Sequence, residues 1–327
     1  MSHFEVVQAQ FILPMIDSLR NAGVPVGKYL MGAGLDKFNF DDPDSFIPLK
    51  CCIDFFELVA RKETGGVIPI EVLTSYKIAE MGNWGRYLAS RRDFLSVCVD
   101  ATSLEGRLFS TESMDFWVAA GSASVTNHWT GDRSLAQRWC ETISLRLMID
   151  ALELVDEKDS GPNAIWIKGD PSEELVDILS ESTPVMQLDR PGIGISFPTK
   201  LLSTPLNANG AMGNGYSLLD TAIPTTLTEC IEAILDVASD RLVPNLQSIA
   251  YHADMSARDL QRKLQLEGSS FSDILRRWRL RTAMKLLGDG DLPIKEVAYR
   301  LKYSHSAHFV RAFKRSTGLT PGQFRHK

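Results

Sequence analysis

Residues 246–264 read LQSIAYHADMSARDLQRKL, and this stretch decides the fold of the last third of the chain. Ser256 is a residue type that caps helix N-termini, and Asp259 three positions later completes a capping-box pattern. Leu260 and Leu264 are four residues apart, so both must face inward from one side of a helix. The stretch therefore predicts a short helix, a tight turn and a second helix that begins after Ser256, which we call the first motif.

A related stretch follows at residues 294–315, which read IKEVAYRLKYSHSAHFVRAFKR. Here Phe309 and Phe313 form the inward pair, and a turn is predicted near Lys302; we call this the second motif. Apolar positions between the motifs predict one long connecting helix, namely Phe271, Ile274, Leu275, Trp278 and either Met284 or Leu287. About 17 helical residues span about 26 Å, enough to hold two helices near successive major grooves of bent DNA.

Polar side chains remain on the outer face of the second helix of each motif. In the first motif the expected DNA-binding residues are Ser256, Ala257, Arg258, Gln261, Arg262 and Gln265. In the second motif they are His305, Ser306, His308, Arg311, Lys314 and Arg315. In a major groove Arg recognises guanine and Gln recognises adenine, while Lys314 and Arg315 are placed for phosphates. One such surface helix is more often merely solvated, but two basic motifs sharing one connecting helix favour DNA.

The charge of the chain is divided between its two parts. The whole sequence has 35 Lys+Arg and 41 Asp+Glu, a formal net charge of −6 that by itself argues against a nucleic-acid partner. Residues 245–327 nevertheless hold 16 Lys/Arg and 7 Asp/Glu, a net of +9, which leaves residues 1–244 with 19 and 34, a net of −15. Blocks of opposite sign imply different partners, and a basic block suits a polyanion because bound phosphates release counterions. Charge alone leaves open a basic face that is only solvated.

The sequence of the first part of the chain predicts an α+β domain. Its first 100 or so residues are predicted to be mostly helical, and β-rich runs follow at residues 116–120, 164–168 and 192–197. A long helix is predicted from about Leu135 to Leu154, and a further helix after Pro171. Residues 205–215 are rich in Asn, Gly and Ala without periodicity, as is typical of linkers. The predicted division is an α+β domain at 1–204, a linker at 205–224 and an all-α domain at 225–327.

Signals for other chemistry are weak. The cysteines form no CxxC pair and no zinc-like spacing with His, so they are predicted to be reduced, buried thiols, with redox or metal sensing at Cys51-Cys52 as a minor alternative. No GxGxxG, P-loop or HExxH motif occurs, and residues 121–124 lack the last Gly of a nucleophile elbow. We therefore predict no catalytic residues, no metal, no cofactor and no enzyme activity. No apolar run is long enough for a membrane span and no signal peptide is evident, which favours a cytoplasmic location.

At this point the sequence resembles the AraC/XylS family of transcription regulators. The resemblance covers roughly residues 225–327, and its signatures occur in the family's order at residues 255–264, 279–283, 286–287, 294–298, 309–315, 318–321 and 324–325. The first part resembles, more weakly, the arabinose-binding-type sensor domain of one branch of that family. Its short cues are residues 34–36, 42–44, 47–48, 197–198, 201–202 and 205–206. This second resemblance implies a sensing and dimerising role without naming the ligand.

Three positions depart from the family's pattern. The family usually has Gly in the tight turn of each motif, whereas Asp254 and Lys302 occupy those places here. Asp tolerates left-handed backbone angles fairly well and Lys does so at a cost, so the second motif is expected to hold DNA more weakly or with more tolerance of sequence. Ala307 stands where a hydroxyl is common, which removes one possible polar contact.

The resemblance implies a sequence-specific transcription regulator, expected to be a homodimeric activator that binds promoter DNA and RNA polymerase. Its first domain would bind a small molecule, dimerise, or do both. The main alternative is a ligand-independent regulator whose first domain serves only for dimerisation or protein contact. The effector site stays unknown: aromatic candidates are Trp84, Tyr87, Phe109, Phe116, Trp117, Trp129, Trp139 and Trp166, and cationic ones are Arg86, Arg91, Arg92, Arg133 and Arg138. Core packing and surface ion pairs are the simpler explanations for both sets.

Overall fold

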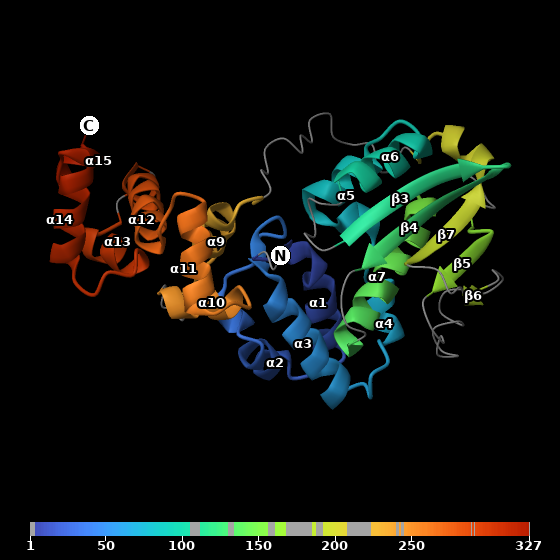
Figure 1. Ribbon diagram of the computed structural model, residues 1–327, viewed down its shortest axis with the longest axis horizontal. Helices are drawn as coiled ribbons and strands as arrows, with labels where there is room; N and C mark the ends of the chain where they lie inside the picture. The colour runs from blue at the N-terminus through green and yellow to red at the C-terminus, as the bar shows by residue number, and fades with distance from the viewer. Residues whose placement is uncertain are drawn as a thin grey trace. The chain divides into compact units, whose positions relative to one another are not determined.

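The computed structural model of the 327-residue chain describes residues 4–104, 112–129, 134–155, 161–167, 185–187, 192–207, 224–239, 242, 245–288, 290 and 292–326 (Figure 1). These residues form two compact units. The N-terminal body consists of the described residues of Glu5–Leu35 and Phe40–Ile223. The C-terminal body consists of Phe4, Asp36–Asn39 and the described residues from Pro224 onward. Each body is considered by itself.

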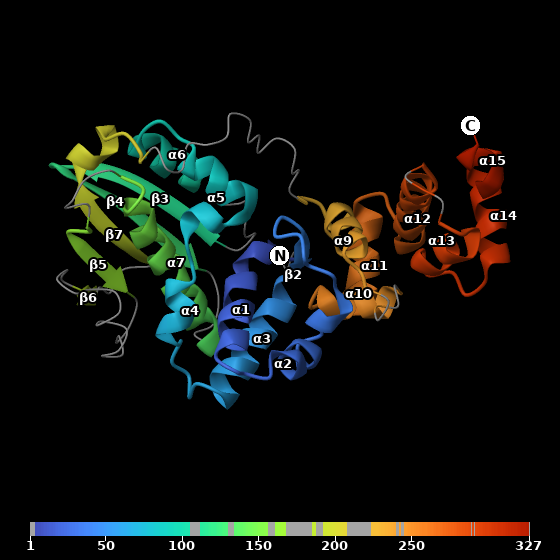
Figure 2. The same cartoon turned by 180° about the vertical axis from the view of Figure 1, so that it is seen from behind.

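The first hundred residues are mostly helical, as the sequence predicts. Their helices are α1 (Leu13–Asn21), α2 (Val26–Gly32), α3 (Leu49–Lys62), α4 (Ile70–Thr74), α5 (Gly82–Ala89) and α6 (Phe94–Leu104) (Figure 2). Two short strands, β1 (Val6–Gln8) and β2 (Phe46–Pro48), pair in antiparallel fashion among them. The amphipathic helix α3 buries one whole face, including Cys51, Cys52, Phe55 and Phe56.

A five-stranded sheet completes the N-terminal body. Its strands lie in the order β3 (Glu112–Ala119), β4 (Ser122–Trp129), β7 (Ile193–Pro198), β5 (Ala164–Ile167) and β6 (Val185–Gln187). Neighbours are antiparallel except β5 and β6, which are parallel. The predicted strands at residues 116–120, 164–168 and 192–197 correspond to β3, β5 and β7. β4 was not predicted, because its sequence SASVTNHW is largely polar; it forms a hairpin with β3 through Ala120 and Gly121, both at positive φ.

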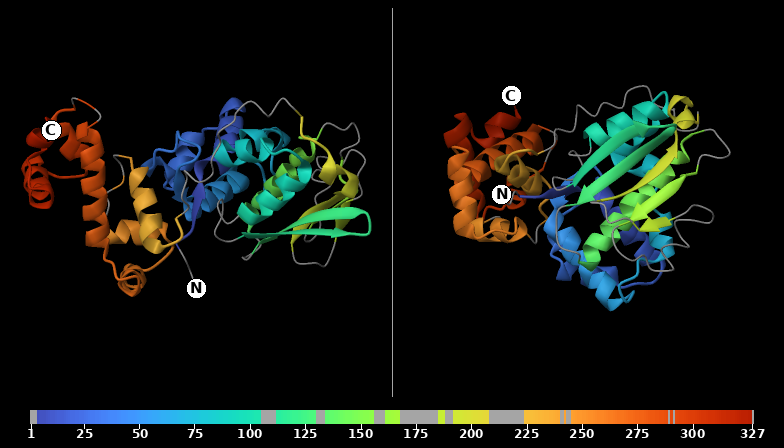
Figure 3. Two further views of the ribbon diagram at one scale, coloured as in Figure 1. Left: turned by 90° about the horizontal axis from the view of Figure 1, so that it is seen from above. Right: turned by 45° about the vertical axis from the view of Figure 1, so that its right-hand side comes forward.

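Helices cover one face of this sheet. α6 packs against β3, and the long helix α7 (Leu135–Leu152) packs against β4 and β7 (Figure 3). The predicted helix from Leu135 to Leu154 is therefore confirmed to within two residues. Ser134 caps α7 by accepting a hydrogen bond from the backbone N–H of Gln137 at 3.1 Å. The predicted helix after Pro171 lies outside the described residues.

The C-terminal body is helical throughout its described part. Its helices are α9 (Leu227–Asp236), α10 (Leu246–His252), α11 (Ala257–Leu266), α12 (Phe271–Gly288), α13 (Ile294–Arg300), α14 (Ser306–Thr317) and α15 (Pro321–Arg325). An α+β region followed by an all-α region with two helix-turn-helix motifs is the predicted fold class, and it is confirmed. Most of the predicted linker, residues 208–223, lies outside the described residues. None of the helices described here is both long and apolar enough to cross a membrane.

Candidate nucleic-acid interface

The first motif consists of α10 and α11. The Ser256 hydroxyl caps α11 by accepting a hydrogen bond from the backbone N–H of Asp259 at 3.0 Å, and it donates one to the Asp259 carboxylate at 2.6 Å. The hydroxyl of Ser256 and the nearby guanidinium of Arg262 hold the pKa of the Asp259 carboxyl below its ordinary value. Leu260 and Leu264 are fully buried, as their spacing predicts. The cap therefore fixes where α11 begins, and the two leucines fix which face points outward.

Two left-handed residues bracket α11. Asp254, in the turn before it, has φ +51°, and the turn is closed by hydrogen bonds from Met255 N to Ala250 O and from Asp254 N to Tyr251 O. Gly268 has φ +69° after the helix, and Ser269 N bonds to Leu264 O at 2.8 Å. The φ of Asp254 agrees with the expectation that it takes the place of a turn glycine, and Gly268 ends α11 in the same left-handed conformation.

A segment from early in the chain completes the C-terminal body. Phe38 is 5% exposed and stacks edge-to-face on the buried His252 ring of α10, with 5.0 Å between ring centroids. The backbone around it pairs with the chain beyond α9, through Asn39 N to Val237 O at 2.6 Å and Ser239 N to Lys37 O at 2.8 Å. Sequence reasoning placed Asp36–Asn39 with the first domain, because four residues carry no periodic signal of their own. The structure instead packs them beside the first motif.

The six predicted residues of the first motif lie along α11 and its cap. Ser256, Arg258, Gln261, Arg262 and Gln265 are exposed and Ala257 is half-buried. The guanidinium of Arg262 also lies 3.5 Å from the carboxylate of Asp259, one turn earlier. This ion pair is exposed at both ends, so a base or phosphate can displace it at little cost. Their contacts with DNA stay predictions.

The C-terminal end of α11 is tied to α9. The Glu267 carboxylate accepts hydrogen bonds from the backbone N–H groups of Leu227 and Thr228, at 2.9 and 3.1 Å, and from the Thr228 hydroxyl. These are first-turn N–H groups of α9, where a negative charge is stabilised. Sequence reasoning missed α9 and this contact. Glu267 thus fixes the C-terminal end of α11 against the first turn of α9.

The connecting helix α12 carries both core and ion-pairing residues. Ile274, Trp278 and Leu287 are buried, whereas Met284 is 42% exposed, which settles the choice between Met284 and Leu287. The arginines on another face pair with acids of α9: Arg281 lies 2.6 Å from Glu232 and 3.0 Å from Asp236.

The acids of α9 lower the net positive charge of the C-terminal body below the value counted from residue 245. Residues 224–327 hold 17 Lys/Arg and 11 Asp/Glu, a net of +6 rather than the +9 counted from residue 245. Arg277 forms an ion pair with Glu232, and Arg281 forms ion pairs with Glu232 and Asp236. The cations left over for a polyanion are therefore concentrated on the recognition helices.

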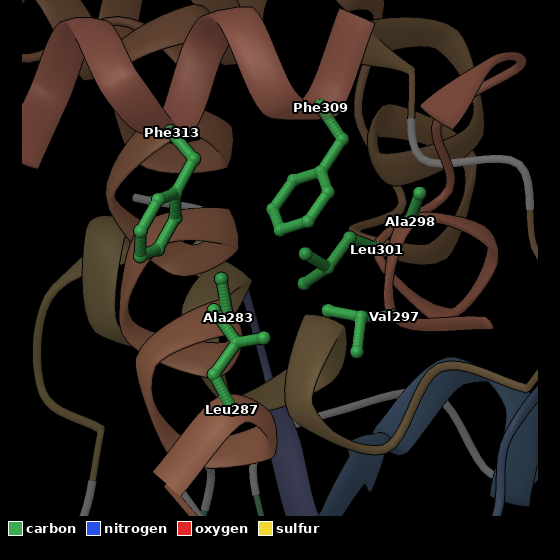
Figure 4. Close-up of a cluster of buried hydrophobic side chains, with 7 residues drawn as sticks. All are labelled: Ala283, Leu287, Val297, Ala298, Leu301, Phe309 and Phe313. Atoms are coloured by element: carbon green, nitrogen blue, oxygen red, sulfur yellow. The ribbon is translucent and has the colours of Figure 1, made fainter. Parts of the chain in front are cut away.

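The second motif has a larger hydrophobic core. It is built from the connecting helix, α13 and α14, and its buried members are Ala283, Leu287, Val297, Ala298, Leu301, Phe309 and Phe313 (Figure 4). The predicted inward pair, Phe309 and Phe313, points from α14 toward Leu301 and α12 in this view. The two rings lie 5.7 Å apart, and Phe313 also meets Phe324 of α15 edge-to-face. This core fixes the outward face of α14.

The turn of the second motif is strained but well supported. Lys302 has φ +58°, as expected if it stands where the family has Gly, and such a backbone costs a non-glycine residue about 1–2 kcal/mol. The Arg279 guanidinium of α12 donates to the carbonyls of Leu301 and Lys302, at 2.9 and 3.0 Å, and stacks over the Tyr303 ring at 4.3 Å. The Lys302 ammonium donates to Ser239 O at 2.8 Å. These contacts offset the strain.

α14 presents a cationic surface. All six predicted residues, His305, Ser306, His308, Arg311, Lys314 and Arg315, are exposed. The N-cap residue His305 makes no capping side-chain bond, and the first turn contains no acid, so the positive end of the helix is unscreened. In the described part of the chain, Arg311, Lys314 and Arg315 form no ion pair. A hollow of about 190 Å³ beside them is lined by Arg276, Arg279 and Arg315 among others, and Arg276 was missed by sequence reasoning.

Other chemistry finds no support in the described residues. No group of three or more His, Cys, Asp or Glu side chains among them is arranged to hold a metal ion. All five cysteines lie in the described residues and are buried, as predicted, and no disulfide bond joins them. Burial raises the pKa of the Cys98 and Cys230 thiols to about 12 and that of Cys52 well above its ordinary range. Thiols this buried are poor nucleophiles, which argues against redox sensing at Cys51-Cys52.

Two helix-turn-helix motifs, joined by one helix and bearing exposed cations, define a DNA-binding transcriptional regulator. A family model described as a helix-turn-helix domain matches residues 249–327. The HTH-type transcriptional regulator Rv1395 of Mycobacterium tuberculosis is 23% identical over 92% of this chain and 91% of its own length. GlxA of Rhizobium meliloti is 41% identical over 24% of this chain and 25% of its own. The crystal structure of CdpR from Pseudomonas aeruginosa aligns with 93% of this chain and 97% of its own at 18% identity, with a TM-score of 0.40.

The C-terminal part of the chain is an AraC-type helix-turn-helix domain, and the protein is a DNA-binding transcriptional regulator. The resemblance stated for residues 225–327 is thereby confirmed, and so is the assignment to a regulatory rather than an enzymatic class. The type of the first domain is not identified by these similarities.

Proposed function

We propose that the protein is a sequence-specific promoter-binding activator in which the two motifs do different work. The first motif discriminates between bases, through Arg258, Gln261, Arg262 and Gln265, with Ser256 and Ala257 at the start of the helix. The second motif supplies a more sequence-tolerant grip on phosphates, through Arg311, Lys314 and Arg315, with His305, Ser306 and His308 nearest the groove.

One difference carries this proposal: α11 is capped and bears an acid, whereas α14 is uncapped and purely cationic. A side chain that is preorganised by its own helix suits bidentate base recognition. Free first-turn N–H groups together with Arg and Lys suit phosphate oxygens, which carry no sequence information.

The test is a binding survey with randomised double-stranded DNA, performed at two salt concentrations. The expected result is a site with one strongly constrained half and one weakly constrained half. Substitutions on α11 should relax the constrained half, and substitutions on α14 should weaken binding to all sequences. Two halves constrained equally, each by its own motif, would refute the division of work.

We further propose that the N-terminal body senses a small molecule, a role that the resemblance to arabinose-binding-type sensor domains implies without naming the ligand. A cavity in that body, where α6 and α7 cover the sheet, supports sensing over the ligand-independent alternative. Binding would favour one arrangement of the protein over others and so shift the fraction competent for promoter DNA. A ligand-dependent change in promoter affinity tests this role, and transcription by RNA polymerase in vitro tests activation.

The third part of the proposed function is homodimerisation, and an edge of the five-stranded sheet is a candidate surface for it. β3 is one of the two edge strands of the described sheet, and on it Trp117 is 67% exposed and Val118 is 54% exposed. An exposed edge with apolar residues is suited to pairing with a second copy. Sedimentation should show that the full chain is a dimer and that the Trp117→Lys variant dimerises more weakly. A monomer in both cases would refute dimerisation through this edge.

A further inference from the structure

The cavity of the N-terminal body has a composition that restricts what it can hold. It measures about 80 Å³ and lies where α5, α6 and α7 meet strands β3, β4 and β7. Its wall is mostly hydrophobic, with Phe94, Val97, Met148, Ile195 and Phe197 among the lining residues. No residue that lines it in the described part of the chain is charged. A buried carboxylate or ammonium would lose its hydration there without a counterion, so charged ligands are disfavoured.

Three polar side chains lie in this wall. Asn127 of β4 and Ser144 of α7 are both buried, and the Asn127 amide nitrogen is 3.5 Å from the Ser144 hydroxyl. Trp84 of α5 is 7% exposed, and its buried indole N–H makes no hydrogen bond to any described residue. A buried donor without an acceptor is costly and uncommon in native proteins. A bound molecule with one acceptor atom would satisfy it.

The cavity also has the features of a site rather than of a packing defect. Native cores are close-packed with few voids larger than a water molecule, so a cavity of this size in a well-formed core needs a reason. Its wall includes Met81, Met114 and Met148, whose flexible side chains adapt to a ligand's shape. Because it is bounded by three helices and the sheet, an occupant would contact all of these elements at once.

From these observations we infer that the effector is an uncharged, mainly hydrophobic small molecule with a single hydrogen-bond acceptor. It lies between α6, α7 and the sheet, with its acceptor toward Trp84 and the Asn127–Ser144 pair. Sugars and amino acids, with many polar groups or formal charges, do not match this wall. The inference rests on the proposed sensing role and specifies the chemistry of its ligand.

The experiment uses the full chain and two probes of similar length, 2-heptanone and heptanoate. The ketone has one acceptor and no charge, while heptanoate has a carboxylate. Binding is measured by calorimetry and by the rise in unfolding temperature with probe concentration, which reports binding to the folded state. The expected result is that 2-heptanone binds at least tenfold more tightly than heptanoate. Equal or tighter binding of heptanoate would overturn the inference.

Matched variants on one helix locate the binding site. Val97 lines the cavity, whereas Val99 of the same helix is 44% exposed and does not. Val97→Phe should reduce 2-heptanone affinity at least tenfold, and Val99→Phe should leave it unchanged. Ala101→Leu fills the same cavity with a smaller change, should Val97→Phe fail to fold. Equal affinities of the lining and control variants would overturn the site.

A third variant tests the acceptor contact. Trp84→Phe keeps an aromatic ring and removes the N–H, so it should lower the affinity for 2-heptanone by about 3- to 10-fold. The affinity for heptane, which has no acceptor, should change much less. Promoter affinity, measured in the same samples, separates the two proposals. If the ketone binds in the cavity but promoter affinity does not change, the cavity inference stands and effector sensing is refuted. If the ketone does not bind in the cavity, the inference is refuted, and the proposed DNA binding is unaffected.

Discussion

The two helix-turn-helix motifs share a plan but are held in place by different parts of the chain. The first motif has a small core, a capped recognition helix and a neighbour, Phe38, contributed from some 200 residues earlier in the sequence. The second has a seven-residue buried cluster, an uncapped recognition helix and a turn clamped by Arg279 of the connecting helix. The first motif thus packs against a segment inserted between parts of the N-terminal body, whereas the second is held by α12, with one further hydrogen bond from Lys302 to Ser239 O.

This difference suggests where regulation enters. The chain leaves the N-terminal body after Leu35, contributes Asp36–Asn39 to the C-terminal body and returns at Phe40. If regulation by the N-terminal body passes through this segment, α10 is a helix that it contacts, through Phe38 and His252. The motif proposed to discriminate sequence is then also the motif exposed to control.

The largest expected effects come from removing the same ring from each motif. Phe309→Ala and Phe38→Ala each delete a buried phenyl group, which typically costs about 3–5 kcal/mol. Amide hydrogen exchange should show lost protection in α13–α14 for Phe309→Ala and in α10–α11 for Phe38→Ala. Unchanged protection of α10 and α11 in Phe38→Ala would contradict the difference drawn between the two motifs, because the early segment would then not stabilise the first motif.

Arg262→Ala should have the next largest effect, confined to one base pair. Loss of a bidentate arginine contact costs about 1–3 kcal/mol at the cognate base and relaxes specificity there. Binding to a set of sites that differ at each position in turn is the measurement. Glu296→Ala is the control, because it also breaks an ion pair within one helix, with Arg300, but lies outside α11. A uniform loss across all sites would show that Arg262 contacts phosphate.

Arg315→Ala should weaken binding to every site alike. Removing one phosphate contact lowers the slope of log affinity against log salt by about 0.9. Titrations at four salt concentrations on cognate and unrelated duplexes give this slope. Arg281→Ala serves as the matched arginine control, since its guanidinium is occupied by Glu232 and Asp236. A sequence-dependent loss in Arg315→Ala would mean that the second motif also recognises bases.

The contrast between the motifs also marks what sequence can and cannot predict. Leu260, Leu264, Phe309 and Phe313 were assigned to the core correctly, because helical spacing is a local pattern that packing preserves. The left-handed turns were predicted as well, because residue type and position constrain φ locally.

Contacts between distant segments were beyond such reasoning. The packing of Phe38 against His252 and the clamp by Arg279 join residues that no local pattern relates. β4 was missed because an interior strand need not look hydrophobic when one face carries Ser, Thr and His. The cavity likewise depends on three-dimensional packing: of the eight aromatic effector candidates, only Trp84 lines it in the described structure, while Trp139 is a core residue bonded to Gly66 O.

The smallest effect concerns the strained turn of the second motif, and it needs two substitutions at Lys302. Lys302→Gly relieves the left-handed backbone but loses the ammonium bond to Ser239 O, so its net change in unfolding free energy should be near zero. Lys302→Met loses the same bond and keeps the strain. Methionine should therefore be less stable than glycine by about 1 kcal/mol, measured by urea unfolding. Equal stabilities would show that the hydrogen bonds from Arg279, rather than the residue type at 302, determine the conformation of this turn. The two motifs would then differ in the contacts that hold their turns but not in backbone strain.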